Sequence, residues 1–300
     1  MKGAIVPLVP AIGLKRILYA TDFSEASRLA LPLVAAIARR YGSSLLLAHV
    51  WPPAIYPTVA PEAVAILDRR EEREARKSLD RLLREPVLNG IPAQIELRCG
   101  SPAHELKRMV EQRRVDLVVA STHGKTGLKH RVLGSVTEDL VRKLSCPVLT
   151  VGPHSDRESG VLKTVDNILF PTDFSPESLA VFPYLASLAN EYHSHLTVLH
   201  VLPLETAGNP EAKKLAEPLR RRMENTLSQQ ISPRSTAEFV IEAGDVVEQI
   251  LAAARRVHAD LIGLGVRSAT DIAMHFRETT AYRILAESEC PVLTHHAPDR

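Results

Sequence analysis

An internal repeat constrains this chain more than any other feature, because it spans most of the 300 residues. The segment "ILYATDFS" at 17–24 returns as "ILFPTDFS" at 168–175, and "SCPVLT" at 145–150 returns as "ECPVLT" at 289–294. Copies of this length are typical of whole domains. The repeat therefore predicts two tandem domains, residues 1–154 and 155–300, which meet in a polar connection.

Within each copy, short apolar runs alternate with segments of helical spacing. This βαβα order predicts an α/β fold in which each domain has a five-stranded parallel sheet flanked by helices. Ser24 and Ser175 stand where they would cap the helices that follow the first strands. Pro32 and Pro183 fall inside those predicted helices, so we expect a kink at the same place in both domains.

Composition excludes several classes of protein. The chain has 37 Lys and Arg against 35 Asp and Glu, and these charges are scattered, so no nucleic-acid partner is expected. The apolar start contains two prolines and indicates a tail, not a signal peptide. No apolar run is long enough to span a membrane. We expect a cytoplasmic protein.

The three cysteines, Cys99, Cys146 and Cys290, are too far apart to indicate a disulfide framework, which fits a reducing compartment. Cys146 and Cys290 occupy the same repeat position beside proline, which predicts core packing. A metal site of Cys290 with His295 and His296 is the alternative, but this spacing matches no recognised ligand pattern. No metal-ligating residue is therefore predicted.

The segment "ASTHGKTGLKHRVLGSVTEDL" at 120–140 contains three glycines between a predicted strand at 116–120 and a helix predicted at about 136–145. In parallel α/β sheets, ligands bind beyond the carboxyl ends of strands, where a helix N-terminus offers unpaired N–H groups. Glycine at 124 and 134 lets phosphate oxygens approach the backbone closely. The segment predicts a polyanion site, although it is neither a P-loop nor a dinucleotide fingerprint.

Several of these residues have a structural alternative. Ser135 begins the pattern S-x-x-E, so its hydroxyl could serve only to cap its own helix. His123 could be an ordinary loop histidine, and it is the one candidate for a general base near the glycines. Asp22 and Asp173 follow the first strand of each copy, where an acid binds ligand or supports the turn. The residues by themselves leave these alternatives open.

The order "LYATDFS", "LLAHV", "CGSPAHEL" and then 116–151 resembles the universal stress protein family across the first domain. ATP-binding members carry Gly, two residues, Gly, nine residues, Gly and then Ser or Thr. Here the pattern begins with Ser121 in place of the first glycine and continues with Gly124, Gly134 and Ser135. The resemblance implies Rossmann-like domains of the HUP type that bind ATP with Mg or Mn.

The resemblance also implies which residues of the first domain face the nucleotide. Four residues would face the adenosine: Ala20, Thr21, Asp22 and Val50. The residues that would face the ribose and phosphates are Ser121, Thr122, His123, Gly124, Lys125, Thr126, Gly127, Gly134, Ser135, Val136 and Thr137.

The second copy departs from this pattern at decisive positions. Gly265 stands at the position of Ser121, but Ser268 replaces Gly124, Glu278 replaces Gly134, and Thr279 replaces Ser135. The Coulomb repulsion between a carboxylate and a phosphate charge about 4 Å away is about 4 kcal/mol per unit charge at an effective dielectric constant of about 20. We therefore predict that the second domain binds no ATP.

Family members tend to dimerise through the last strand, so the resemblance implies that the two domains pair edge to edge within one chain, with a homodimer as a further arrangement. It also implies a cytoplasmic, ATP-binding regulatory protein of the stress response. The alternatives are a weak ATP hydrolase or another nucleotide-dependent enzyme, and a scaffold that binds no ATP. No catalytic residue is assigned.

Overall fold

The computed structural model describes residues 12–53, 61–122, 133–152, 164–203, 210–231, 235–267 and 279–296. These residues fold into two compact units, one of Leu14–Val161 and one that holds Leu162–Arg300. The predicted connection at 153–163 lies outside the described residues, and the predicted boundary at residue 154 stays a prediction.

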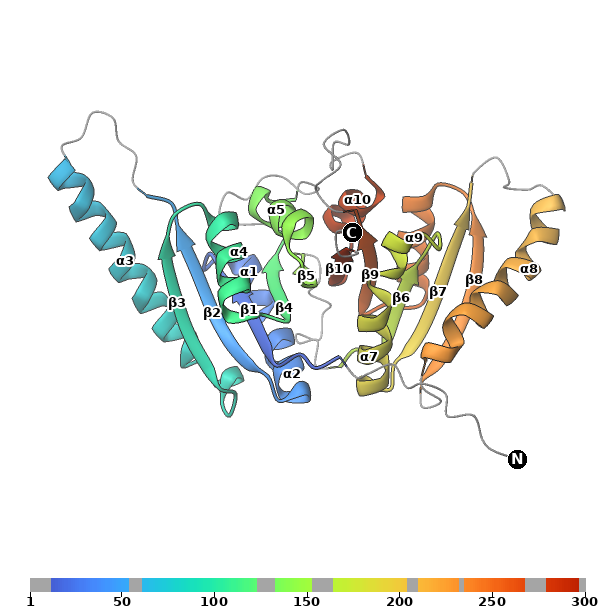
Figure 1. Cartoon of the computed structure of the whole chain (residues 1–300), viewed down its shortest axis with the longest axis horizontal. Helices are drawn as coiled ribbons and strands as arrows, with labels where there is room; N and C mark the ends of the chain where they lie inside the picture. The colour runs from blue at the N-terminus through green and yellow to red at the C-terminus, as the bar shows by residue number, and fades with distance from the viewer. Residues whose placement is uncertain are drawn as a thin grey trace. The chain divides into compact units, whose positions relative to one another are not determined.

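The first unit alternates strands and helices (Figure 1). Its strands are β1 (Arg16–Ala20), β2 (Ser44–Trp51), β3 (Ala93–Cys99), β4 (Leu117–Ser121) and β5 (Val148–Val151). Its helices are α1 (Glu25–Leu29), α2 (Leu31–Tyr41), α3 (Pro61–Leu83), α4 (Pro102–Arg113), α5 (Ser135–Lys143) and the short 3₁₀ helix η1 (Pro86–Leu88). The strand predicted at 116–120 and the helix predicted at 136–145 are both present with slightly shifted ends.

The second unit repeats this order. Its strands are β6 (Asn167–Pro171), β7 (His195–Leu202), β8 (Thr236–Ala243), β9 (Leu261–Val266) and β10 (Val292–His296). Its helices are α6 (Pro176–Leu179), α7 (Phe182–Tyr192), α8 (Pro210–Leu227), α9 (Val246–Arg256), α10 (Thr280–Glu287) and the 3₁₀ helix η3 (Ser228–Gln230).

Every described strand pair within a unit is parallel. The order is β3-β2-β1-β4-β5 in the first unit and β8-β7-β6-β9-β10 in the second. Both sheets are Rossmann-like, as predicted. The order reverses direction between β1 and β4, and again between β6 and β9, which is where such sheets bind ligands.

The central strands are continuous apolar runs because helices cover both of their faces. Ile17, Leu18 and Tyr19 of β1 are fully buried. The Tyr19 hydroxyl donates to the Ser27 carbonyl, and burial raises the pKa of Tyr19 to about 12. Phe170 takes this position in the second unit and packs against Phe182, with ring centroids 5.1 Å apart. The apolar ring needs no such acceptor.

One aspartate fixes the amino edge of each sheet. Asp116 Oδ2 accepts the backbone N–H groups of Lys15 and Arg16, both at 2.8 Å. Asp260 Oδ2 accepts the corresponding groups at 166 and 167, at 3.0 and 2.9 Å. These bonds join the start of the first strand to the residue before the fourth and so set their register.

The prediction of a kinked helix at Pro32 and Pro183 is wrong. The chain forms two helices there in each unit, and proline lies in the first turn of the second helix, α2 or α7. A residue in the first turn has no intrahelical acceptor for its N–H, so proline loses nothing at that place. The proline therefore starts a helix.

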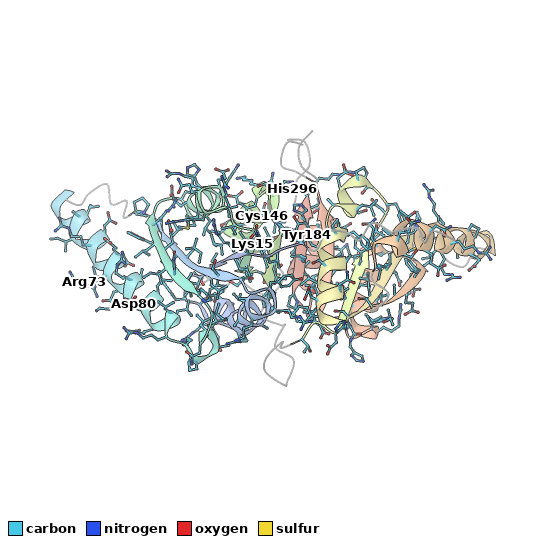
Figure 2. All side chains as sticks on the ribbon, turned by 60° about the horizontal axis from the view of Figure 1, so that its bottom comes forward. Lys15, Arg73, Asp80, Cys146, Tyr184 and His296 are labelled. Carbon is cyan, nitrogen blue, oxygen red and sulfur yellow. The ribbon has the colours of Figure 1, made fainter. Side chains whose placement is uncertain are left out.

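Helix α3 is long and only partly packed. Figure 2 labels Arg73 and Asp80 on this helix. Its buried residues, Ala75, Leu79 and Leu82, all lie in the C-terminal part, where the helix packs on β2 and β3. The charged side chains form a solvated face, as predicted, with Glu72 and Arg76 at 3.9 Å.

Candidate functional site

The site is built from the ends of β1, β2 and β4 and the start of α5, which all reach the carboxyl edge of the first sheet. After β1, Thr21 Oγ1 accepts the Phe23 N–H and shares a hydrogen bond with Ser27 Oγ, both at 3.0 Å. Asp22 Oδ1 accepts the Ser24 N–H at 3.0 Å. Ser24 caps α1 by accepting the Ser27 N–H, as predicted. These bonds hold Asp22 in a fixed turn directly after the strand.

The backbone of this turn is strained at Phe23. Its φ is 63°, in the left-handed region that a bulky side chain rarely adopts. The Phe23 ring packs against the His49 ring at a centroid distance of 4.5 Å. His49 Nδ1 lies 2.7 Å from the Thr21 carbonyl oxygen, so that nitrogen carries the proton. The contact joins the ends of β1 and β2, beside the buried Val50.

The end of β4 is tied to the start of α5. Ser121, Thr122 and Thr137 are all buried. The Gly134 N–H donates to the Thr122 carbonyl oxygen at 2.8 Å, and Thr137 Oγ1 donates to the Ser121 carbonyl oxygen at 2.7 Å. A Cβ added at Gly134 would lie 3.3 Å from the Thr122 carbonyl oxygen, so a side chain here would make a tight contact with the end of β4.

Helix α5 begins at Ser135, and its N-cap is Gly134. The alternative that Ser135 serves as the N-cap is therefore wrong. Since Ser135 lies inside the first turn, its hydroxyl does not close the helix, and it bonds no residue within the described ranges. Val136 follows in the same turn, where backbone N–H groups have no intrahelical acceptors. Backbone donors and one hydroxyl thus meet at the positive end of the helix dipole.

Five of the predicted ligand residues lie outside the described residues. They are His123, Gly124, Lys125, Thr126 and Gly127. The structure does bring the other ten to the same edge of the first sheet, at the ends of three strands and the start of α5. The point between β1 and β4 where the strand order reverses divides these residues. On the β1 side lie Ala20, Thr21, Asp22 and Val50, and on the β4 side lie Ser121, Thr122 and the start of α5 from Gly134 to Thr137.

The second unit reproduces the first turn almost atom for atom. Thr172 Oγ1 accepts the Phe174 N–H at 3.0 Å, and Asp173 Oδ1 accepts the Ser175 N–H at 3.0 Å. Phe174 has a φ of 64°, and His200 Nδ1 lies 2.8 Å from the Thr172 carbonyl oxygen. Burial would raise the pKa of Asp173, but the hydrogen bonds from Ser175 and Ser178 lower it below its ordinary value.

The two units differ at the end of the fourth strand and at the start of the last helix. A Cβ at Gly265 would lie 1.9 Å from the Glu177 carbonyl oxygen, so the backbone of α6 rests directly on the end of β9. The first unit has Ser121 at this position. In addition, Thr279 is the N-cap of α10, and its hydroxyl accepts the Tyr282 N–H at 3.2 Å. The hydroxyl that replaces Ser135 is therefore used by its own helix.

Sequence reasoning did not assign roles to His49 and Phe23. The same two residue types recur in the second copy as Phe174 and His200. This recurrence could have indicated the contact, because a contact between two strand ends needs both partners. The role of Thr137 as a tether had no local signal, since its acceptor lies sixteen positions earlier in another element.

The predicted cysteine burial is only partly confirmed. Cys290 is buried, Cys146 is partly buried in the loop before β5 (Figure 2), and Cys99 is exposed. Burial raises the pKa of the Cys146 thiol to about 12, which keeps it protonated. Among the described residues, Cys290, His295 and His296 form no cluster that could hold a metal ion. No described helix is both long and apolar enough to cross a membrane.

The chain belongs to the universal stress protein family. The family model matches twice, at residues 13–152 and 164–296, once in each unit. The chain is 31% identical over 154 residues to universal stress protein MJ0577 of Methanocaldococcus jannaschii, a match that covers 46% of this chain and 94% of that protein. Universal stress protein YxiE of Bacillus subtilis is 30% identical over 144 residues, which cover 45% of this chain and 97% of that protein.

A solved structure has the same tandem arrangement of folds along its length. A universal stress protein from Archaeoglobus fulgidus superposes with a TM-score of 0.74 at 20% identity, covering 94% of this chain and 98% of that one. At this identity the likeness concerns the fold alone. The chain is thus a tandem member of the family, with two copies of its α/β domain.

Proposed function

We propose that the first domain binds ATP at the carboxyl edge of its sheet and that the protein is a cytoplasmic, nucleotide-dependent regulator. The observation that carries this proposal is the start of α5, where Gly134 takes the N-cap position and the Ser135 hydroxyl is not used for capping. This helix end faces the same sheet edge as the turn at Thr21 and Asp22. Anions are stabilised at such an end by N–H groups and by the helix dipole.

The residues present fit a nucleoside triphosphate. A Cβ at Gly134 would lie only 3.3 Å from the Thr122 carbonyl oxygen, so a side chain there would crowd the start of α5 where the phosphates would bind. Ser135, Val136 and the glycine segment with Lys125 would hold the phosphates, and Asp22 with Val50 would face the adenosine. Mg or Mn would accompany the phosphates and neutralise part of their charge. The second domain, with Glu278 and the capping Thr279, binds no ATP in this proposal.

Calorimetric titration of the intact chain with ATP and magnesium tests the proposal. One site per chain is expected. Gly134→Glu copies the second domain's residue into the first and should weaken binding about a thousandfold, as expected for an unscreened carboxylate close to a phosphate. Gly134→Gln is the matched control, because it adds nearly the same bulk without the charge and should lose less affinity.

A second pair of variants separates binding from folding. Asp22→Ala and Asp173→Ala remove the same turn-stabilising bond from the two domains. Both should lower stability, and Asp173→Ala also removes the acceptor of the Ser175 hydroxyl at 2.6 Å, but only Asp22→Ala should weaken ATP binding. If the intact chain bound no ATP, the proposal would be wrong and a scaffold would be the better interpretation. Phosphate release during the titration would favour the alternative of a weak hydrolase.

The last strands of the two units, β5 and β10, end the strand order of their own units. Their pairing within one chain, or between chains in a homodimer, stays a prediction.

A further inference from the structure

Two backbone carbonyls at the end of β4 accept hydrogen bonds from the first turn of α5 and its N-cap. Thr137 Oγ1 donates to the Ser121 carbonyl oxygen at 2.7 Å, and the Gly134 N–H donates to the Thr122 carbonyl oxygen at 2.8 Å. Thr137 is 5% exposed and Thr122 is 2% exposed, so water cannot replace either bond. We call these two bonds the β4–α5 clamp.

The clamp joins the end of β4 to the start of α5. Leu133, directly before the N-cap Gly134, is 1% exposed, which anchors the start of α5 in the core. Thr122 is also held from the other side, because its N–H donates to the Val151 carbonyl oxygen at 3.0 Å. The start of α5 is therefore held in place before any ligand arrives, which lowers the cost of ordering it on binding.

The two domains differ in the residue that makes this possible. The copies align without a gap from Asp116 to Thr150 and from Asp260 to Thr294, so Ala281 stands at the position of Thr137. Alanine has no hydroxyl to donate. The helix of the second domain also begins after its own threonine cap, Thr279, whereas α5 begins directly after Gly134. The clamp and the open helix start therefore occur together in one domain.

We propose that Thr137 is a positioning residue that holds the start of α5 against the end of β4 in the geometry that receives phosphates. This inference rests on the proposed function. Thr137 acts through the Ser121 carbonyl, and its hydroxyl proton is already committed to that acceptor in the ligand-free protein. It does not need to touch the nucleotide.

Three variants of the full chain test the role. Thr137→Val keeps the shape but removes the donor, and Thr137→Ser restores the donor. Ser43→Ala is the matched control, because the buried Ser43 hydroxyl donates to the Leu14 carbonyl at the opposite, amino edge of the same sheet. Thr137→Val should weaken ATP binding about fivefold, the equilibrium equivalent of one neutral hydrogen bond. Adenosine binding should not change, and Thr137→Ser should restore ATP affinity.

Amide hydrogen exchange of the ligand-free protein separates positioning from direct contact. Thr137→Val should speed exchange of the Gly134 amide, whereas Ser43→Ala should lower overall stability without a selective effect at Gly134. Unchanged exchange at Gly134 in Thr137→Val would overturn the inference, even if ATP binding were weaker, since the hydroxyl would then act on the ligand itself. Equal losses for adenosine and ATP would also overturn it. If the wild-type chain bound no ATP, the exchange result would still decide whether the clamp exists.

Discussion

At the scale of single residues, the two domains fill the same space with different side chains. Val34 on α2 and Val119 on β4 are both fully buried in the first unit. The residues at the same repeat positions in the second unit are Leu185 and Gly263, so bulk has moved from the strand to the helix. A Cβ at Gly263 would lie 2.2 Å from Leu185 Cδ1 and 2.8 Å from its Cγ. A side chain at 263 would force Leu185 to shift, and because Leu185 is fully buried we expect this shift to be costly.

Gly263→Val should therefore destabilise the second domain by about 1–3 kcal/mol through overpacking. Adding Leu185→Val, which copies the first domain's pair, should recover part of that loss. Urea unfolding followed by far-UV circular dichroism measures both variants and Leu185→Val alone. Strictly additive effects of the two substitutions would show that these side chains do not share the space.

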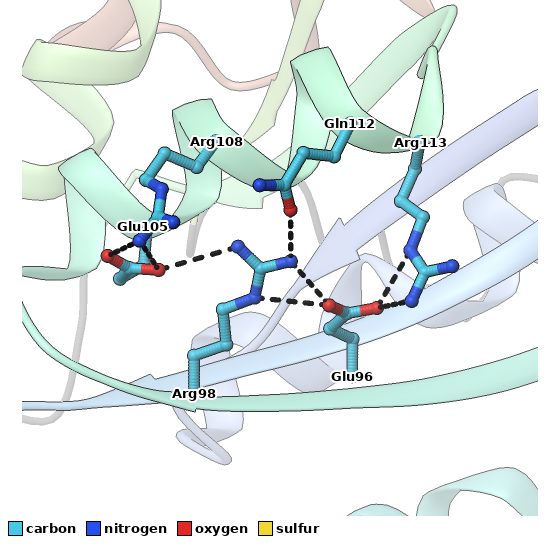
Figure 3. Close-up of polar contacts among 6 residues, drawn as sticks. All are labelled: Glu96, Arg98, Glu105, Arg108, Gln112 and Arg113. Atoms are coloured by element: carbon cyan, nitrogen blue, oxygen red, sulfur yellow. Dashed lines mark hydrogen bonds and ion pairs between the residues drawn. The ribbon is translucent and has the colours of Figure 1, made fainter.

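At the scale of elements, a network of charges fastens α4 to β3 (Figure 3). Arg98 on β3 donates to Glu96 at 2.6 Å, to Gln112 at 2.8 Å and to Glu105 at 3.4 Å. Arg113 also donates to Glu96, at 2.8 Å. In the second unit the positions of Arg98 and Gln112 hold Glu242 and Arg256, which form an ion pair of 2.9 Å. The contact between strand and helix is kept, but the arginine now lies on the helix and its partner on the strand is a carboxylate.

This network should make the first domain sensitive to acid. Burial alone would raise the pKa of Glu96, but hydrogen bonds from Arg98 and Arg113 lower it below its ordinary value of 4.5. A carboxylate with a lowered pKa stabilises the fold fully above its unfolded pKa, and this contribution disappears as the pH falls through the folded value. The pKa of Glu105 is lowered as well, chiefly by the hydrogen bond from Arg108.

Glu96→Gln should lower stability at neutral pH by about 1 kcal/mol, a value reduced by the solvent around the half-exposed Arg113. The loss of stability between about pH 6 and about pH 3 should then be shallower than in the wild type. Thermal unfolding at a series of pH values measures this slope. Glu242→Gln is the control in the more exposed pair of the second unit and should have the smaller effect. An unchanged slope in Glu96→Gln would contradict the assignment.

At the scale of the whole molecule, the two units are alike in the turn after the first strand and differ at the end of the fourth strand. The turn after the first strand has the same bonds and the same strained phenylalanine in both units. The end of the fourth strand differs, because the backbone of α6 lies against Gly265, whereas the first unit has Ser121 at this position. If ATP binds the first domain as proposed, we expect nucleotide to stabilise that domain and to leave the second domain unaffected.

The single tryptophan of the chain, Trp51, lies at the end of β2 and reports on the first domain alone. ATP at a hundred times its Kd should stabilise that domain by about 2.7 kcal/mol and raise the midpoint of the Trp51 fluorescence transition. Gly134→Glu should show no such shift at the same ATP concentration. A shift of equal size in this variant would place the nucleotide elsewhere.

The sequence by itself determined the repeat, the parallel α/β class and the position of most elements. Short apolar runs such as 17–20, bounded by turn residues and alternating with helical patterns, are typical of buried strands, and a duplicated pattern predicts a duplicated fold. The serine caps at Ser24 and Ser175 were also predictable, since a cap depends on residues only three positions away. Local rules suffice wherever the interacting groups are neighbours in the chain.

Only the tertiary structure decided the roles of residues whose partners are distant. The two prolines begin new helices, Gly134 replaces Ser135 as the cap, and Thr137 bonds a carbonyl of another element. Gly265 matches the family's first glycine in sequence, yet it serves the packing of α6. Each role depends on how closely two elements approach in space, and this distance follows from the packing of the whole domain.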